Sequence, residues 1–565
     1  MFRSLSSPAA LTTLAVSLFA VGNADVQALG TFRWQLQPYR NVVTPSLTQA
    51  GSVNRVQGTD DQRGAGRDMA SAIGTEAAQD THGPGVAADD ARGDEDGSSR
   101  FGRMFHLPSF ATPTPVVKAA LVRMGARGQV LDAQDNLAAG PVALIVNPLL
   151  NVNNRNNETH TAGVTFLGQF LDHDMTFDTS SRLGRPTNPR RTLNARRPFF
   201  DLDSVYGDGP SGSPALYEPL DRAKLRVENG GIYEDLPRDA AGRAIIADPR
   251  NDENVVIAGL QAAMLLAHNA TVDAVRLAEP GIDTEEAFAE ARRLLTWHYQ
   301  WIVLHEFLPQ IVGQPLVDRV LAEGPRFYRP RPDDAFIPVE FQLAYRIGHS
   351  MVRPSYRANF TGNGGQPFFA LVFDPTQEGA TDPSDLRGGV RGARRFVGWT
   401  TFFRFPGFEG DVRPNKRIDT KLSTPLFDLP IGAIASGAPP TSLAERNFLR
   451  HLTWSIPSGQ AIAAAMGVPA LADTHFAELA EFHARFVRAT PLWYYVLKEA
   501  EVLAQGFRLG PVGARLVAEV FVGLLQSDSD SFLHAEPPFS PSLGPTPGQF
   551  TVVDLLTYAG VGGRR

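Results

Sequence analysis

Apolar residues recur every three or four positions over several long stretches of the chain, which is the spacing of amphipathic helices. The longest stretch follows a possible N-cap at Asp283 or Thr284 and reads EEAFAEARRLLTWHYQWIVLHEFLPQIVG, residues 285–313. The same pattern covers residues 255–278, 472–488 and 511–525. Strand-like runs such as FFALVF, residues 368–373, are few and short. We therefore expect a mainly α-helical fold with few short strands, rather than the alternating strands and helices of a doubly wound sheet.

The first hundred residues lack this helical pattern. Residues 51–100 are rich in Gly, Ala, Asp and Arg and cannot bury enough apolar surface to offset the entropy of ordering, which predicts a flexible linker. Nearer the N-terminus, Arg3 precedes a short apolar run at residues 9–22, and small residues follow it. This pattern is typical of a secretory signal, and a helix retained in the mature protein is the alternative.

These features predict the organisation of the chain and its location. We expect a signal peptide at residues 1–28, an N-terminal segment and low-complexity linker at 29–100, and one large domain at 101–565. Cleavage of the signal implies a secreted or periplasmic protein, whereas retention implies a cytoplasmic one.

Charge and composition narrow the classes of partner. The 565 residues include 53 basic and 60 acidic side chains, a net charge of -7, which gives no basic footprint for nucleic acid. The absence of cysteine excludes disulfides, thiolate metal sites and cysteine nucleophiles. We find no apolar run of 18 or more residues and therefore expect no membrane span.

Acidic and imidazole side chains crowd into QFLDHDMTFD, residues 169–178, beside an apolar run. If residues 164–175 form a helix, Gln169, Asp172 and His173 stand at i, i+3 and i+4 and converge on one volume, while Asp174 points elsewhere. The alternative is a core histidine within a capping cluster of aspartates.

Three further motifs accompany this one. YRIGH places His349 in an apolar segment with Arg346 three residues before it, and a buried imidazole beside a guanidinium suits a metal ligand with an anion nearby, as in a heme with its propionates. PRNDEN holds Arg250 and Glu253 at i and i+3 ahead of an apolar helix, and LAERN holds Asn447.

Together these motifs resemble the animal-type heme peroxidase superfamily, which also contains the cyclooxygenases, and in particular its bacterial members akin to peroxidasin and myeloperoxidase. The resemblance covers residues 101–565 and implies a large, single, mainly α-helical heme-peroxidase domain. It also implies catalytic roles for three residues. Gln169 would hold distal water or halide, His173 would be the distal acid and base, and Arg250 would be the distal arginine.

The resemblance implies heme b as cofactor and assigns its contacts. His349 would be the axial ligand of the heme iron, Asn447 would accept a hydrogen bond from its other ring nitrogen, and Arg346 would pair with a propionate. Asp172 and Glu253 would form esters with the heme, and the alternative is that both are ordinary buried acids paired with the arginine.

A calcium site is also implied. Asp174 would join Asp201 and Asp203 as side-chain ligands, and Phe199 would supply a carbonyl oxygen, a donor set that suits Ca2+. The family's loop commonly begins with a threonine, and Arg197 occupies that place here. Occupancy of the site is therefore open.

The implied activity is reduction of hydrogen peroxide through a ferryl intermediate, coupled to oxidation of a halide, thiocyanate or phenolic donor. Asn254 stands where the chloride-oxidising relative has a methionine bonded to heme, so bromide, iodide, thiocyanate and phenols are better candidates than chloride. Two alternatives stay open: a fatty-acid dioxygenase of the same superfamily, and a secreted heme-binding adhesion protein with vestigial catalysis. The dioxygenases need a tyrosine three residues before the proximal histidine, where this chain has Arg346, with Tyr345 one residue further back.

Overall fold

The computed structural model describes residues 99–229, 233–391 and 394–563, which belong to one compact unit, Asp90–Arg565. The predicted signal peptide and all but two residues of the predicted linker lie outside the described residues, and both stay predictions.

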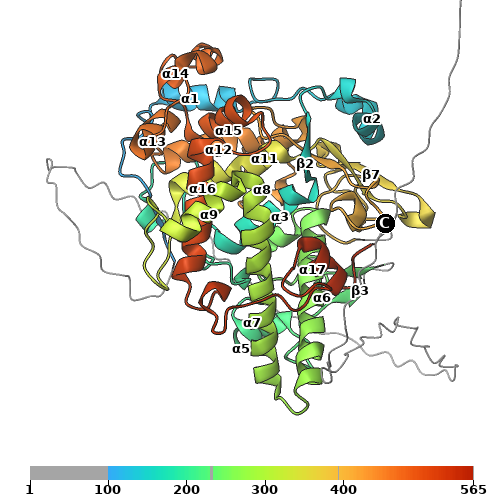
Figure 1. Cartoon of the computed structure of the whole chain (residues 1–565). Helices are drawn as coiled ribbons and strands as arrows, with labels where there is room; N and C mark the ends of the chain where they lie inside the picture. The colour runs from blue at the N-terminus through green and yellow to red at the C-terminus, as the bar shows by residue number, and fades with distance from the viewer. Residues whose placement is uncertain (1–98, 230–232, 392–393, 564–565) are drawn as a thin grey trace, which may run out of the picture. The chain divides into compact units, whose positions relative to one another are not determined.

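The described part of the chain is mainly helical with few short strands, as predicted (Figure 1). Its α-helices are α1 (Pro115–Met124), α2 (Gly140–Val146), α3 (Gly163–Met175), α4 (Asp203–Tyr206), α5 (Gly209–Gly212), α6 (Val255–Ala278), α7 (Thr284–Ile302), α8 (Leu308–Val312), α9 (Gln314–Glu323), α10 (Val339–Ala344), α11 (Gly348–Met351), α12 (Leu443–Thr453), α13 (Gly459–Met466), α14 (Arg485–Arg488), α15 (Leu492–Ala504), α16 (Pro511–Ser527) and α17 (Val552–Tyr558).

The strands form small two-stranded sheets at separate places in the fold. They are β1 (Phe101–Gly102), β2 (Asn156–Thr161), β3 (Glu228–Asn229), β4 (Glu234–Asp235), β5 (Ile337–Pro338), β6 (Ser355–Asn359), β7 (Phe368–Leu371) and β8 (Pro414–Lys416). β1 pairs with β5 in parallel, and the antiparallel pairs are β2 with β8, β3 with β4 and β6 with β7.

Most of the predicted helices form where the periodicity placed them. α6 spans Val255–Ala278, α16 covers the predicted 511–525, and the long stretch after Asp283 folds as α7, a π-helical turn at Val303–Phe307, and α8. Asp283 is the cap, since its side chain accepts a hydrogen bond from the Glu286 amide at 2.8 Å. α6 and α7 run side by side as a long hairpin (Figure 1).

The prediction of one helix over 472–488 is wrong. The chain forms a 3-10 helix at Asp473–Glu481 and then the short α14. The buried side chains Phe476, Leu479 and Phe482 recur at intervals of three, and a 3-10 helix places such residues on one face.

The core surrounds α3, which brings the first motif into the interior. α3 packs against α6 and α11, and ten of its thirteen residues are buried. A Cβ on Gly163 would stand 2.4 Å from the Phe403 ring, so glycine is required for α3 to begin this close to its neighbour.

Among the described residues, α6 is the one helix long and apolar enough to cross a membrane by length and composition. Its most apolar window is 83% buried inside the fold, as expected of a core helix.

Candidate functional site

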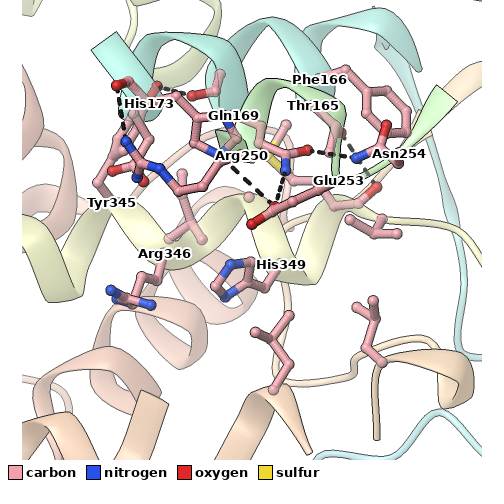
Figure 2. A pocket seen from close by; sticks show the side chains of 18 of the residues that line it. Thr165, Phe166, Gln169, His173, Arg250, Glu253, Asn254, Tyr345, Arg346 and His349 are labelled. Atoms are coloured by element: carbon pink, nitrogen blue, oxygen red, sulfur yellow. Dashed lines mark hydrogen bonds and ion pairs between the residues drawn. The ribbon is translucent and has the colours of Figure 1, made fainter. Parts of the chain in front are cut away.

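A cavity of about 260 Å³ lies between α3 and the α10–α11 segment. Three stretches that are far apart in sequence line it. α3 contributes Gln169, Asp172 and His173, the chain leading into α6 contributes Arg250, Glu253 and Asn254, and the segment before and within α11 contributes Tyr345, Arg346 and His349. Figure 2 shows His173, Gln169 and Glu253 on one side of this space and His349 on the other.

The helical faces of α3 divide as the sequence predicted. Gln169, Asp172 and His173 line the cavity. Asp174 is fully buried on another face, where the Ser204 hydroxyl donates to it at 2.9 Å. The helix therefore serves two separate polar sites.

His173 is held as a neutral imidazole. Burial, assisted by the positive charge of Arg250, lowers its pKa to about 3. Its Nδ1 is 2.8 Å from the Oδ1 of Asn251, whose own Nδ2 donates to Gln261 Oε1 at 2.8 Å. A neutral ring can accept a proton, as a general base must.

Arg250 lies beside His173 and is fixed by several bonds. Its Nη2 donates to the His173 carbonyl at 3.0 Å, and its Nε and Nη2 donate to Asp248 at 3.0 and 2.7 Å. The guanidinium also lies over the Phe177 ring, 4.3 Å from the ring centroid. Although burial opposes the charged form, Asp248 raises the pKa of Arg250, so the site contains a permanent cation.

Hydrogen bonds link the side chains of Asn254, Gln169 and Glu253 along the side of the cavity that contains His173. Asn254 Nδ2 donates to Gln169 Oε1 at 3.3 Å, and Gln169 Nε2 donates to Glu253 Oε2 at 3.2 Å. Asn254 also caps α6, accepting from the amides of Val256 and Ile257. Burial raises the pKa of Glu253 to about 8, which makes its protonated form available near neutral pH.

Asp172 lies in the same cavity. Its Oδ1 accepts from the Thr176 hydroxyl at 3.2 Å. Burial raises its pKa, while Arg250 and Arg346 oppose the shift.

On the proximal side, the predicted contact between His349 and Asn447 is present, since Asn447 Nδ2 lies 2.8 Å from His349 Nδ1. Arg346 Nη1 donates to Asn447 Oδ1 at 3.1 Å. The predicted direction of the bond, from the imidazole to the amide, stays a prediction. Burial, assisted by Arg346, lowers the pKa of His349 to about 3, which leaves the neutral form that binds metals.

These residues fit a heme. The neutral His349 imidazole borders the cavity, and Arg346 brings a cation into it. Among the described residues, the side-chain hydrogen-bond partners of the Arg346 guanidinium are the amide oxygens of Gln342 and Asn447 rather than carboxylates. Burial lowers the pKa of Arg346 to about 10, so it is still charged and can neutralise an acidic group brought by a ligand.

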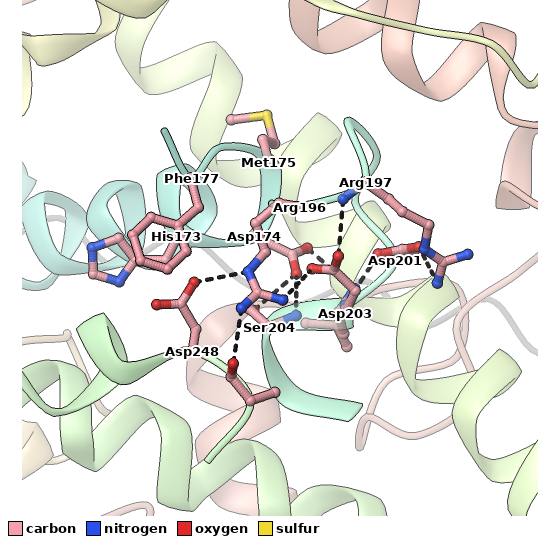
Figure 3. Close-up of polar contacts among 12 residues, drawn as sticks. His173, Asp174, Met175, Phe177, Arg196, Arg197, Asp201, Asp203, Ser204 and Asp248 are labelled. Atoms are coloured by element: carbon pink, nitrogen blue, oxygen red, sulfur yellow. Dashed lines mark hydrogen bonds and ion pairs between the residues drawn. The ribbon is translucent and has the colours of Figure 1, made fainter. Parts of the chain in front are cut away.

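A second cluster groups the three predicted side-chain ligands of calcium (Figure 3). Carboxylate oxygens of Asp174, Asp201 and Asp203 lie within 4.8 Å of one another. Burial and mutual repulsion raise the pKa of Asp174 strongly and that of Asp203 to about 7. Asp203 Oδ1 is buried without a hydrogen-bond partner among the described residues, although Arg196 Nη1 lies 3.7 Å from it, and direct coordination of a metal cation would satisfy it.

Arg197 occupies the edge of this cluster. Its Nη2 lies 2.5 Å from Asp201 Oδ2, and its backbone amide donates to Asp203 Oδ2 at 2.9 Å. A guanidinium therefore neutralises one of the three carboxylates. Phe199 is in the same loop, and its predicted role as a carbonyl ligand stays a prediction.

Sequence reasoning missed the residues that support the catalytic candidates. Asp248 directly precedes the PRNDEN motif, Asn251 is within it and Gln261 follows it. Asp248 could have been found as a capping aspartate before Pro249. Arg446 and Arg450 of α12 also line the cavity. Asp178, which follows α3, forms an ion pair with Arg450.

His268 of α6 has the contacts of a structural residue. It is fully buried, its Nδ1 lies 3.1 Å from the Tyr206 hydroxyl, and its Nε2 lies 2.8 Å from the Ala223 carbonyl.

Comparison with known proteins shows similarity to a family over part of the chain and to solved structures over most of it. Residues 178–376 match the family model for animal haem peroxidase. The human probable oxidoreductase PXDNL is 24% identical over 229 residues, which cover 35% of this chain and 15% of the relative. Thyroid peroxidase of Canis lupus familiaris is 28% identical over 233 residues, 36% of this chain and 24% of the relative. The chain thus matches only a small part of the length of these relatives.

The matched segment contains the candidates Arg250, Glu253 and His349 and ends before Asn447. Because it begins at residue 178, it does not include Gln169 or His173.

The solved structures cover more of the chain. Peroxidase A from Dictyostelium discoideum has a TM-score of 0.55 at 15% identity, covering 82% of this chain and 94% of that chain. A fatty acid alpha-dioxygenase from Oryza sativa has a TM-score of 0.53 at 14% identity, covering 83% and 80%. The described chain therefore has the animal-type peroxidase fold, and its residues 178–376 resemble the animal haem peroxidase family.

Proposed function

We propose that this chain is a heme peroxidase that reduces hydrogen peroxide and oxidises small electron donors. The observation that carries the proposal is the arrangement of two neutral histidines, His173 and His349, around one buried cavity, with the fixed cation of Arg250 beside the first. The family match and the fold support it.

When bound, the heme iron supplies the redox chemistry. His349 and Arg346 would hold the group, and the other steps belong to the chain. His173 takes a proton from peroxide at one oxygen and returns it to the departing oxygen, which one neutral imidazole can do. Arg250 stabilises the negative charge that develops on the leaving oxygen, a contribution of about 3 kcal/mol for one well-placed donor in a water-excluded site.

The residues beside His173 support a proposal for the electron donor. Asn254 stands where the chloride-oxidising relative has a methionine. Its side-chain amide donates to Gln169, and Gln169 donates to Glu253. We propose bromide, iodide, thiocyanate or a phenol as donor in preference to chloride. Assays with guaiacol and with each halide in the presence of hydrogen peroxide test this, and turnover fastest with chloride would contradict it.

We propose that Asp172 and Glu253 are the sites of heme esters. Both carboxyl groups line the cavity. Acid acetone extraction after peroxide turnover should leave heme attached to the protein. Heme that leaves freely would show that both are ordinary buried acids.

We propose Ca2+ for the cluster of Asp174, Asp201 and Asp203. Arg197 pairs with Asp201, and Arg196 Nη1 lies 3.7 Å from Asp203, but Asp174 has no ion-pair partner among the described residues. Oxygen-only ligands of this kind suit Ca2+.

A fatty-acid dioxygenase is the second candidate function, and Tyr345 is the observation that favours it. Its side chain lines the cavity, and its hydroxyl donates to the Gly168 carbonyl at 3.0 Å. Oxygen uptake with linoleate in the absence of peroxide would support a dioxygenase, and peroxide-dependent oxidation of guaiacol without such uptake supports the peroxidase.

The alternative of a heme-binding adhesion protein with vestigial catalysis predicts heme binding without turnover. The candidate partner-binding segment for this alternative is the predicted linker at residues 51–100, of which only residues 99 and 100 are described. The guaiacol and bromide assays separate this class from a peroxidase.

A further inference from the structure

We infer that Asn251 and Gln261 are positioning residues that hold His173 in the tautomer with its proton on Nδ1, so that Nε2 presents a lone pair to the cavity. The inference rests on the proposed function, because it concerns the base of the peroxide reaction.

The three side chains form one buried chain of hydrogen bonds. His173 Nδ1 lies 2.8 Å from Asn251 Oδ1, and Asn251 Nδ2 donates to Gln261 Oε1 at 2.8 Å. Their exposed fractions are 4%, 0% and 1%, so water does not replace these contacts. Buried polar groups need such partners, and losing one costs more than the bond itself contributes.

The direction of the bonds determines the tautomer. An amide nitrogen only donates and an amide oxygen only accepts. Because Asn251 uses its nitrogen on Gln261, its oxygen faces the imidazole and requires a donor there. A neutral imidazole carries one proton, so that proton is on Nδ1 and the lone pair is on Nε2.

The groups near the other ring nitrogen leave it free. The nearest acidic atom, Glu253 Oε2, is 4.0 Å from His173 Nε2, which is beyond hydrogen-bond distance. Arg250 contacts the His173 carbonyl and therefore fixes the backbone rather than the ring. The orientation of the ring depends on Asn251.

This tautomer suits proton removal from hydrogen peroxide. The Nε2 lone pair takes one proton, an O–H bond breaks as an N–H bond forms, and the products are an imidazolium and a hydroperoxide anion. Asn251 Oδ1 continues to accept from Nδ1–H in both states. With the opposite tautomer, Nε2 would already carry a proton and could not act as the base.

The test uses ligands of the heme-loaded full-length protein. Hydrogen cyanide must lose its proton to bind ferric heme as an anion, whereas carbon monoxide binds ferrous heme without proton transfer. The variants are Asn251→Leu, Gln261→Leu and Asn251→Asp, in which a carboxylate restores the acceptor. Asn269→Leu is the matched control. Asn269 lies on α6, as Gln261 does, and among the contacts described its side chain bonds only to the backbone of Leu225.

We expect Asn251→Leu to slow cyanide binding about tenfold or more, Gln261→Leu to slow it less, and Asn251→Asp to recover most of the rate, by analogy with the loss of a group that orients a ligating histidine. Carbon monoxide binding should be unchanged in every variant. Equal cyanide rates in Asn251→Leu and the wild type, or equal losses in Asn251→Leu and Asn269→Leu, would overturn the inference.

The tautomer of His173 can also be measured directly, without a binding rate. In the diamagnetic ferrous carbon monoxide complex, nitrogen NMR of histidine-labelled protein, assigned by comparison with His173→Leu, should show the His173 proton on Nδ1. A proton on Nε2 would overturn the inference and leave the proposed function standing. A wild-type protein that binds no heme would instead overturn the proposed function.

Discussion

The carboxylate of Asp248 holds the guanidinium of Arg250 through two hydrogen bonds, from Nε at 3.0 Å and from Nη2 at 2.7 Å. Arg196 Nε also donates to Asp248, at 2.9 Å, and Arg196 Nη1 lies 3.7 Å from Asp203. A row of charges thus connects the cavity to the candidate calcium cluster.

Removal of Asp248 should affect both stability and the peroxide reaction. Asp248→Ala leaves the buried Arg250 charge without its carboxylate, which should lower the free energy of unfolding by about 3–5 kcal/mol. The reaction with peroxide should slow while heme still binds, because the guanidinium loses its fixed position. Chemical denaturation and stopped-flow absorbance measure the two effects, and a variant as stable and as fast as the wild type would contradict this account of Asp248.

The Arg197 guanidinium should weaken the response to calcium. In the wild type, Ca2+ should raise the melting temperature and a chelator should lower it, because a ligand that binds the folded state stabilises it. Arg197→Thr should increase this shift, since Asp201 is then free to bind the ion. Asp174→Asn should reduce it strongly. Thermal shift assays with and without Ca2+ measure the response, and a shift that is the same in all three proteins would exclude a site at these residues.

Glu306 should make stability depend on pH. Burial raises its pKa from 4.5 to about 7, although its Oε2 accepts from the Val552 amide at 2.7 Å. The folded state therefore binds a proton more tightly than the unfolded state, and stability falls as pH rises from about 4.5 to about 7.

Glu306→Gln keeps an acceptor for Val552 and removes the titration. The free energy of unfolding of the variant minus that of the wild type should therefore be higher at pH 8 than at pH 4, by up to roughly 3 kcal/mol. Denaturation of both proteins across this range gives the difference, in which the other titrating groups cancel. A constant difference would show that Glu306 is not protonated in the folded protein.

Gly388 should be essential for the close packing of its segment against the backbone of Asp252 and Glu253. A Cβ built on Gly388 would stand 1.4 Å from the carbonyl oxygen of Asp252, and the Gly388 amide donates to the Glu253 carbonyl at 2.9 Å. Gly388→Ala should therefore displace this segment, destabilise the protein by about 1–3 kcal/mol or more, and weaken heme retention. Gly432→Ala is the control, because a Cβ there meets no atom within 4 Å. Equal stability of the two variants would contradict the required close approach.

Periodicity predicted much of the fold because buried helices carry a strong pattern. α6 and α16 formed where their apolar residues recur at three and four. Residues 472–488 did not, since their spacing of three also fits a 3-10 helix, and one sequence pattern cannot distinguish the two.

The candidate site was predictable where helical spacing and family resemblance act together. Gln169, Asp172 and His173 share a face, so their common location followed from the sequence. The roles of Asn251 and Gln261 were not predictable, because the contact of Asn251 with His173 depends on how α3 lies against the segment that leads into α6. The contact of Arg346 with Asn447 was not predictable for the same reason, since it joins two segments that are far apart in sequence.

The central claim concerns the two histidines at the cavity, and the absorption spectrum tests it most directly. Heme-loaded wild type, His173→Leu, His349→Leu and Arg250→Ala are measured before and after addition of hydrogen peroxide. Wild type should show a Soret band that changes rapidly with peroxide. His173→Leu should keep the band but react slowly, and Arg250→Ala should react about 100-fold more slowly than wild type. His349→Leu should lose the band or change it radically. An unaltered band in His349→Leu, or an unaltered peroxide reaction in His173→Leu, would contradict the account.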